Sequence, residues 1–178
     1  MSRERIKKAI TELIETIKNK PDTAKAVYRA EVRSGEGLQV KAKVRDFPDF
    51  IVDEPPEVGG KDSGMGPHEA LLVALGACQE ILYVAYAAVM DIPLNNVKID
   101  VKGYMSLKGQ LSMDDSVAPG FTDITFDVQV DSPADEETIK NLAKAVEAHC
   151  PVLDSLVRPV PVKGTLSVNG GKASLISR

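Results

Sequence analysis

The stretch LLVALGACQEILYVAYAAVM, residues 71–90, decides how this chain folds. It is almost entirely apolar and contains a single cysteine, Cys78. A run of about 20 apolar residues can cross a bilayer, but Gln79 and Glu80 lie in its middle, where a charged side chain costs about 2.5–3.5 kcal/mol on insertion scales. Asp91 follows in place of a basic flank. The stretch therefore predicts a buried helix of a globular core, with no role for a membrane.

A helix that is apolar almost all round is stable when most of its faces are covered. A single sheet covers only one face, so we expect a second subunit to cover another and the chain to form an intertwined homodimer. The helix also carries small residues that allow another backbone to approach closely. These are Ala74, Gly76, Ala77, Ala85, Ala87 and Ala88.

The composition excludes some classes of partner and compartment. The net charge is −4 and Lys and Arg are scattered, which argues against nucleic acid because phosphate binding needs a concentrated basic face. The N-terminal residues include Glu4 and Glu12 and form no continuous apolar run, so they do not read as a secretory signal. We expect a cytoplasmic protein whose two cysteines are kept reduced.

The apolar periodicity predicts two other helices and several strands. Residues 3–19 show helical spacing with a charged opposite face, and Pro21 ends that helix. We therefore divide the chain into an N-terminal amphipathic helix, residues 1–22, and a main domain, residues 23–178. Alternating residues predict strands at 27–33, 38–45, 96–109, 121–131 and 162–168, and a later helix runs from a Ser132 cap to about His149. This order predicts an α+β fold with a mostly antiparallel sheet around a long buried helix.

The two cysteines lie in different settings. Cys78 lies on the apolar helix, where burial alone would raise its pKa and leave it inert unless another segment supplies a cation. Cys150 lies 72 residues later, in EAHCPVLDSL, where Pro151 ends a helix. A cysteine at such a break is expected at an accessible, adjustable point. Two thiols placed so differently suit a nucleophile and a resolving partner, although the sequence does not show that they meet.

The motif PHEALLVALGACQE, residues 67–80, followed by AHCPV, residues 148–152, resembles the OsmC/Ohr family of osmotically inducible and organic-hydroperoxide-resistance proteins. The resemblance covers roughly residues 27–169. It implies an OsmC-like fold, an interwoven homodimer and active sites at the subunit interface. Family peroxidases reduce organic and lipid hydroperoxides with a thiolate.

The resemblance also assigns roles to four residues. Cys78 would be the peroxidatic nucleophile and Cys150 the resolving cysteine, with a dithiol such as a lipoylated protein, or a small thiol, as reductant. Arg33 looks like the arginine that lowers the pKa of the thiol, and Glu69 like the carboxylate that orients this arginine. Without the resemblance, Arg33 is a solvated strand residue and Glu69 a carboxylate in a helical first turn.

Spacing places a condition on Glu69. It precedes Cys78 by nine residues, or roughly 13–14 Å along one helix, so it can serve only the thiol of another subunit or act through a bridging arginine. The well-characterised peroxidase branch has one more residue between these positions. The shorter spacing is similar to that of the OsmC-like branch.

No other motif suggests a cofactor. The cysteines with His68 and His149 lack the paired spacing of a zinc site, and no glycine-rich nucleotide loop occurs, so we expect neither a metal nor an organic cofactor. Two alternatives to a peroxidase stay open: a protein that binds a small apolar ligand or thiol carrier without turnover, and a cysteine redox sensor.

Overall fold

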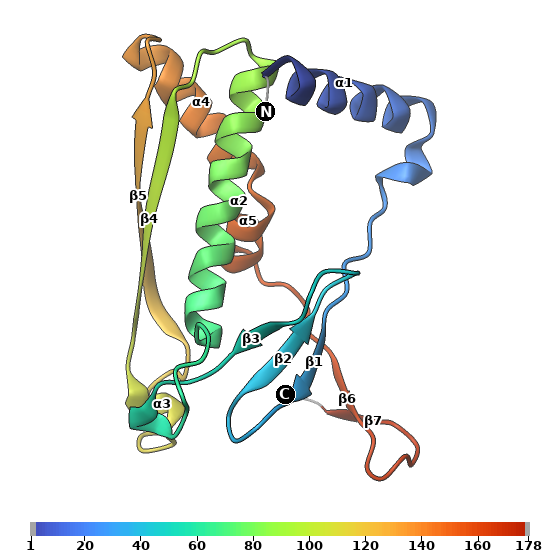
Figure 1. Cartoon of the computed structure of the whole chain (residues 1–178), viewed down its shortest axis with the longest axis vertical. Helices are drawn as coiled ribbons and strands as arrows, with labels where there is room; N and C mark the ends of the chain where they lie inside the picture. Colours follow the sequence, from blue (N-terminus) through green and yellow to red (C-terminus); the bar gives the residue numbers. More distant parts are fainter. Residues whose placement is uncertain (1–2, 177–178) are drawn as a thin grey trace.

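The computed structural model of the chain describes residues 3–176 and has an α+β architecture (Figure 1). Its helices are α1 (Arg3–Asn19), α2 (Pro67–Val89), α3 (Leu107–Gln110), α4 (Glu136–His149) and α5 (Pro151–Val157), with short 3₁₀ turns η1 (Pro21–Ala24) and η2 (Pro56–Val58). Its strands are β1 (Glu31–Ser34), β2 (Val40–Lys43), β3 (Phe50–Val52), β4 (Asn96–Met105), β5 (Phe121–Asp131), β6 (Gly164–Leu166) and β7 (Ser174–Ile176).

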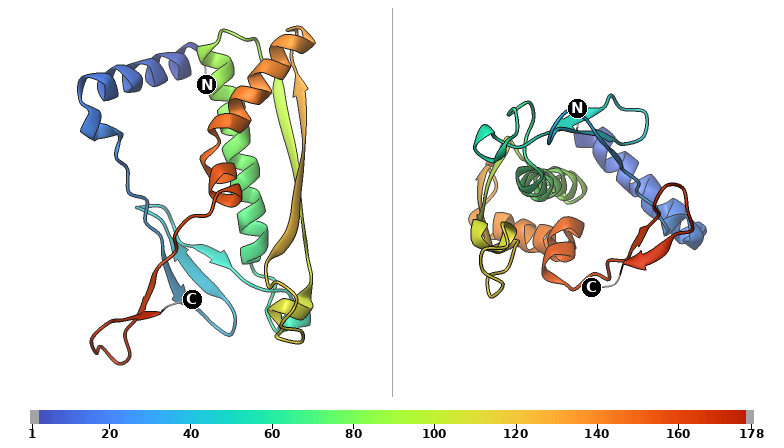
Figure 2. Two further views of the ribbon diagram at one scale, coloured as in Figure 1. Left: turned by 180° about the vertical axis from the view of Figure 1, so that it is seen from behind. Right: turned by 90° about the horizontal axis from the view of Figure 1, so that it is seen from below.

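Helix α2 is the axis of the molecule. Figures 1 and 2 show the β4–β5 hairpin along one side of it and α4 and α5 along another. The antiparallel sheet β1–β2–β3 and the hairpin β6–β7 lie apart, below these elements in Figure 1. Every strand pairing is antiparallel. The predicted α+β fold with antiparallel sheets and a long central helix is therefore confirmed.

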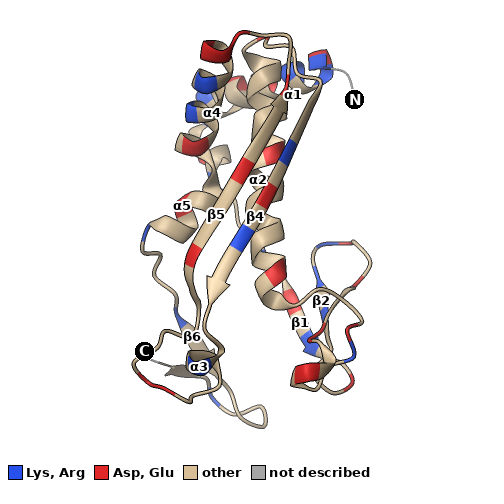
Figure 3. Cartoon of the chain, turned by 90° about the vertical axis from the view of Figure 1, so that its left-hand side faces the viewer, with Lys and Arg blue, Asp and Glu red and all other residues tan. Residues whose placement is uncertain are grey.

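The β4–β5 hairpin follows the alternation predicted from the sequence. Because successive side chains point to opposite faces of a sheet, Ile99 and Val128 pack inward while their neighbours along each strand are exposed. Figure 3 marks the charged positions along β4 and β5. On the outer face Lys102 pairs with Asp127 at 3.8 Å. The inner face closes over the main core cluster, which consists of Tyr83, Ala87, Ile92, Leu142 and Val146.

Only part of the surface of α2 is buried within one chain. Leu75, Gln79, Tyr83 and Ala87, spaced by four, are fully buried, which is the signature of one helical face turned to the core. On another side Ile81 is 62% exposed. Length and composition alone would let α2 cross a membrane, but its packing on β4 and α4 makes it the core helix that the sequence predicts. The burial expected on most of its faces is not achieved by a single chain.

The start of α4 corrects a prediction. Ser132 does not cap this helix. Asp135 is the N-cap, and its carboxylate accepts the Thr138 N–H at 2.8 Å. The Ser132 hydroxyl instead donates to the Pro93 carbonyl, tying the β5–α4 connection to the α2–β4 connection. Both residue types suit a cap, so local preference did not distinguish them.

Short elements account for the remaining differences. Strands β3 and β7 and helices α3 and α5 were not predicted, because three to seven residues are too few to show a period. The strand expected at 96–109 ends at Met105, and helix α3 begins at Leu107. The strand expected at 162–168 is the three-residue β6.

Helix α1 lies across the C-terminal end of α2 (Figure 1). Arg3 and Lys7 form ion pairs with Asp91, just beyond α2. The connection from Lys25 to Ala30 is exposed throughout. The division into an appended helix, residues 1–22, and a main domain, residues 23–178, stays a prediction.

Replacement of Gln79 by leucine tests the core of the chain. Its amide nitrogen and oxygen are buried and have no hydrogen-bond partner within residues 3–176. An unpaired buried polar group costs about 1–3 kcal/mol, so Gln79→Leu should raise the free energy of unfolding by about 1 kcal/mol in urea denaturation. The exposed Gln129→Leu on β5 is the matched control and should change it by less than about 0.5 kcal/mol. A clear loss of stability for Gln79→Leu would show that a bound water or a second chain satisfies the amide.

Candidate active site

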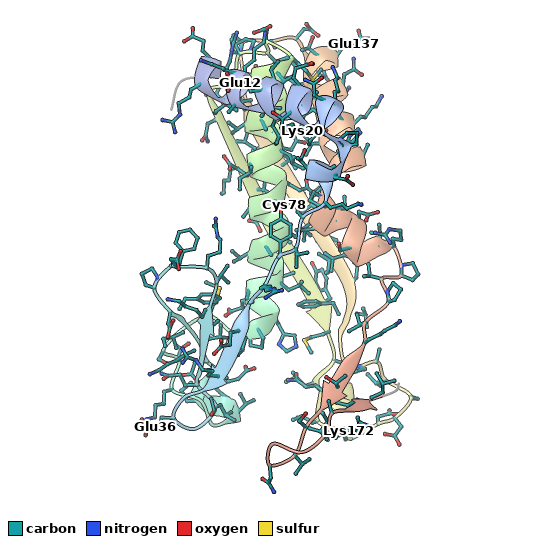
Figure 4. The ribbon with its side chains drawn as sticks, turned by 90° about the vertical axis from the view of Figure 1, so that its right-hand side faces the viewer. Glu12, Lys20, Glu36, Cys78, Glu137 and Lys172 are labelled. Carbon is teal, nitrogen blue, oxygen red and sulfur yellow. The ribbon has the colours of Figure 1, made fainter. Side chains whose placement is uncertain are left out.

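Cys78 lies near the middle of α2 and is half-buried (Figure 4). The helix places it one turn before Leu82 and one turn after Ala74, on a different side from the buried Gln79. The sequence therefore predicts the helix correctly, while the thiol is less enclosed than an apolar core position implies.

The fold brings Cys150 against Cys78. The two thiols interact, since Cys150 contributes to the raised pKa of Cys78 both through a hydrogen bond and through its charge. Both are free cysteines. Two thiols in contact are a pair that two-electron oxidation can join as a disulfide.

Cys150 is only 1% exposed, so the prediction that it lies at an accessible point is wrong. The physical reason is that Pro151 does more than end α4. It also occupies the first position of α5, where a proline is well accommodated. Cys150 is thus both the C-cap of α4 and the N-cap of α5, and α5 covers it.

The first turn of α5 directs backbone N–H groups at both sulfurs. The Leu153 N–H donates to Cys150 Sγ at 3.5 Å, and the Val152 N–H donates to the Cys78 thiol and lowers its pKa. Neither of these N–H groups was predicted from the sequence. The signal was the Cys-Pro pair itself, since a proline at the first helical position leaves the next N–H groups free to point at the cap.

Burial decides the acidity of Cys78 in the single chain. Desolvation raises the pKa of this thiol and is the largest influence on it, the Val152 N–H opposes the rise, and Cys150 adds to it. Neither Arg33 nor Glu69 takes part. An activated thiolate therefore requires a cation that residues 3–176 of the same chain do not bring to Cys78.

Arg33 lies on β1, in the separate three-stranded sheet of Figure 1. Its guanidinium pairs with Asp49 at 3.3 Å and Glu31 at 3.2 Å, and its side chain is 57% exposed. Exposed pairs of this kind contribute little to stability, so the guanidinium is free to exchange them for another partner. The fold of one chain does not bring Arg33 to the thiols.

Glu69 lies in the first turn of α2, where Oε2 accepts the Gly66 N–H at 2.7 Å. This contact satisfies one of the N–H groups that a helix start leaves unpaired, and the carboxylate also faces the positive end of the helix dipole. Within one chain Glu69 is a capping residue. Nine residues separate it from Cys78 of the same helix, so the two side chains do not meet within one chain.

The loop between β3 and α2 is held by a carboxylate that sequence analysis did not select. Asp53 is buried and accepts hydrogen bonds from the backbone of Glu54, Lys61 and Ser63 and from the Ser63 hydroxyl at 2.6 Å. These bonds, that of the Ser63 hydroxyl first, hold the pKa of Asp53 below its usual value.

The same loop is tightly packed around two of its glycines. A Cβ at Gly60 would collide with the Glu54 carbonyl, and one at Gly64 with the Ile51 carbonyl. No larger side chain therefore fits at Gly60 or Gly64. They are needed where the loop closes on itself at the start of α2.

The two histidines have local partners. His149 Nδ1 lies 2.8 Å from the Ala145 carbonyl, in the last turn of α4. The His68 ring meets Phe121 edge-on, with centroids 5.8 Å apart. Across residues 3–176, no three His, Cys, Asp or Glu side chains gather in a way that would hold a metal ion.

Comparisons with known proteins agree with this fold. The family of OsmC-like proteins matches residues 60–164, more than half of the chain. A hydroperoxide reductase from Mycoplasma genitalium is 31% identical over 96 residues, which cover 54% of this chain and 64% of that protein. The match thus spans less than two thirds of the relative.

Solved structures show the same architecture. An OsmC-like protein from Mycoplasma pneumoniae superposes with a TM-score of 0.64 at 25% identity, over 74% of this chain and 87% of the other. An organic hydroperoxide resistance protein OsmC from Legionella pneumophila gives 0.57 at 17% identity, over 75% and 93% of the two chains. At that identity the second likeness concerns the fold alone.

The pH dependence of alkylation tests the environment of Cys78. Since burial raises the pKa of this thiol, its thiolate fraction at neutral pH is lower than that of free cysteine, and its iodoacetamide rate should reach half-maximum at a higher pH when the protein is dilute and monomeric. Rates resolved by peptide mass spectrometry separate Cys78 from Cys150. With the pKa raised by folding, the contribution of Cys78 to stability is complete below the unfolded pKa and is lost as pH rises through the folded value. A monomer profile at or below that of free cysteine would contradict this assignment.

Proposed function

The chain belongs to the family of OsmC-like proteins, and on this premise we propose that it is a thiol-dependent peroxidase for organic hydroperoxides. One observation carries the proposal: Cys78 and Cys150, 72 residues apart in sequence, are in contact. A half-buried thiol beside a fully buried one suits a nucleophile that meets substrate and a second cysteine that resolves the product. The 31% identity to a hydroperoxide reductase supports the same role.

The reaction needs two thiols and no cofactor. The Cys78 thiolate attacks one peroxide oxygen, an S–O bond forms, the O–O bond breaks, and the alkoxide leaves and takes up a proton as an alcohol. The Cys150 thiolate then displaces hydroxide from the Cys78 sulfenic acid, giving a disulfide and, after protonation, water. A dithiol, either a lipoylated protein or a small thiol, returns two electrons by exchange. The cytoplasm, where thiols are kept reduced, is the proposed location.

Activation of Cys78 is assigned to a second subunit. The exposed apolar side of α2 that carries Val73 and Ile81 is the surface that a second copy would bury. In such a homodimer, Arg33 of the partner subunit would lie beside Cys78, lower its pKa and stabilise charge on the departing oxygen. Glu69 would accept hydrogen bonds from that guanidinium.

A second candidate function rests on the raised pKa of Cys78 in the single chain. A thiol that stays protonated would leave a protein that binds a small apolar ligand or a thiol carrier without turnover. A redox sensor is another alternative. In it, a disulfide between Cys78 and Cys150 would alter a surface that a partner contacts.

Rapid mixing of the reduced protein with cumene hydroperoxide tests the proposed chemistry. Two thiols per chain should be lost faster than from free cysteine, and Cys78→Ser should abolish this loss because it removes the nucleophile. Cys150→Ser should lose one thiol and then over-oxidise, as mass spectrometry would detect. Wild-type thiols that react no faster than free cysteine would favour the ligand-binding alternative.

Mixing two inactive variants tests the interface site. Arg33→Ala should lower kcat/KM about a hundredfold by removing a charge that stabilises the transition state, whereas Arg29→Ala, an exposed neighbour before β1, is the matched control. If Arg33 acts across the interface, a mixture of Cys78→Ser and Arg33→Ala chains regains activity, because one site of the mixed dimer has both groups. If the mixture stays inactive although mixed dimers form, Arg33 does not act across the interface.

A further inference from the structure

Helices α1 and α2 line a partly open apolar cavity of about 360 Å³ that the proposed reaction does not use. Its lining consists of Ile10, Ile14, Leu82, Ala85, Tyr86 and Val89. This volume is in the range of small-molecule sites, about 300–1,000 Å³, which are mostly apolar. Helix α1 lies outside residues 60–164, so this wall is not part of the region that matches the family.

The cavity lies on the same side of α2 as the thiol. Leu82, Ala85 and Val89 follow Cys78 by four, seven and eleven residues, a spacing that keeps side chains on one helical face. At about 1.5 Å per residue, they lie roughly 6, 10 and 16 Å along the helix from Cys78. A chain molecule whose reactive end lies at Cys78 would therefore run directly into the cavity.

A cation lies at the far end. On α1, Lys7 precedes Ile10 and Ile14 by three and seven residues and so shares their face. Its ammonium pairs with Asp91, two residues beyond Val89. Arg3 shares Asp91, so two cations meet one carboxylate there. The nearest other acid on α2, Glu80, is turned about 200° from Cys78 and lines a different pocket.

We propose that the α1–α2 cavity is a subsite for the hydrocarbon chain of an amphiphilic hydroperoxide, with the peroxide at Cys78 and an anionic end near Lys7. The inference rests on the proposed peroxidase function, for which lipid hydroperoxides are already expected, and assigns the place where their hydrocarbon chain binds in this fold. It makes the appended helix a determinant of specificity: α1 selects long, unbranched hydroperoxides over short ones. The apolar lining covers part of the chain and shields that part from water, and Lys7 exchanges Asp91 for the carboxylate of the substrate.

The test compares linoleic acid hydroperoxide with tert-butyl hydroperoxide on the full-length protein. Ile14→Gln places an amide in the cavity wall, and the ratio of kcat/KM for the long over the short substrate should fall about tenfold, as expected for losing one apolar side-chain contact. Leu13→Gln, next to it on α1 and more exposed, lies outside the cavity and is the matched control. Its ratio should equal that of the wild type.

The proposed contact between Lys7 and the anionic end of the substrate is tested by removing either charge. Lys7→Gln should weaken the reaction of the free acid severalfold and leave that of its methyl ester at the wild-type value. Palmitic acid, which has no peroxide bond, should inhibit competitively, and Ile14→Gln should raise its inhibition constant.

Each failure points to a different conclusion. If the wild type reduces neither hydroperoxide, the peroxidase proposal fails. If it reduces both but Ile14→Gln leaves their ratio unchanged, the subsite alone is wrong. A third outcome also overturns the subsite. If Ile14→Gln dissociates the protein in sedimentation and lowers both rates equally, while Leu13→Gln does neither, a second copy of the chain fills the cavity.

Discussion

The burial of one face of α2 is the contact on which the other features depend. Tyr83 and Ala87 are buried against β4–β5 and α4, and Leu75 is buried on the same face of the helix. A large apolar side chain such as Leu75 contributes about 1.5–3 kcal/mol when fully buried. This packing fixes the rotation of the helix, and the rotation decides what each remaining residue faces. Cys78 is thereby turned toward α5, and Ile81 is left in solvent.

The thiol pair follows from that rotation and from the break between α4 and α5. A cysteine followed by proline ends one helix and begins the next, so Cys150 is fixed from both sides and buried. The short helix then offers its first N–H groups to both sulfurs. The Val152 N–H lowers the pKa of Cys78, but the desolvation that raises this pKa is the larger influence in the single chain. The site is therefore assembled but not activated, and this is the reason for assigning the missing cation to a second subunit.

Helix α1 lies near the site because it packs on another part of α2. The helix is held to the end of α2 by the pairing of Arg3 and Lys7 with Asp91 and by apolar contact, and Leu13 and Ile14 stay largely exposed. It adds little to the core of the chain. Its position over the thiol-bearing face of α2 is the reason for proposing that it contacts the chain of the substrate.

The sequence by itself determined the elements with a clear period. The apolar run at 71–90 predicted α2, and the alternation at 96–109 and 121–131 predicted β4 and β5, because burial of one face imposes its period on the residues. The end of β4 at Met105 was not predicted. The motif around Cys78 and Cys150 also identified the family. Only the tertiary structure decided that the two thiols touch, that Cys150 is the more buried of the two, and that Arg33 lies away from both. These are contacts between segments far apart in the chain, which local preference does not encode, and they follow from how the faces of α2 are shared among its neighbours.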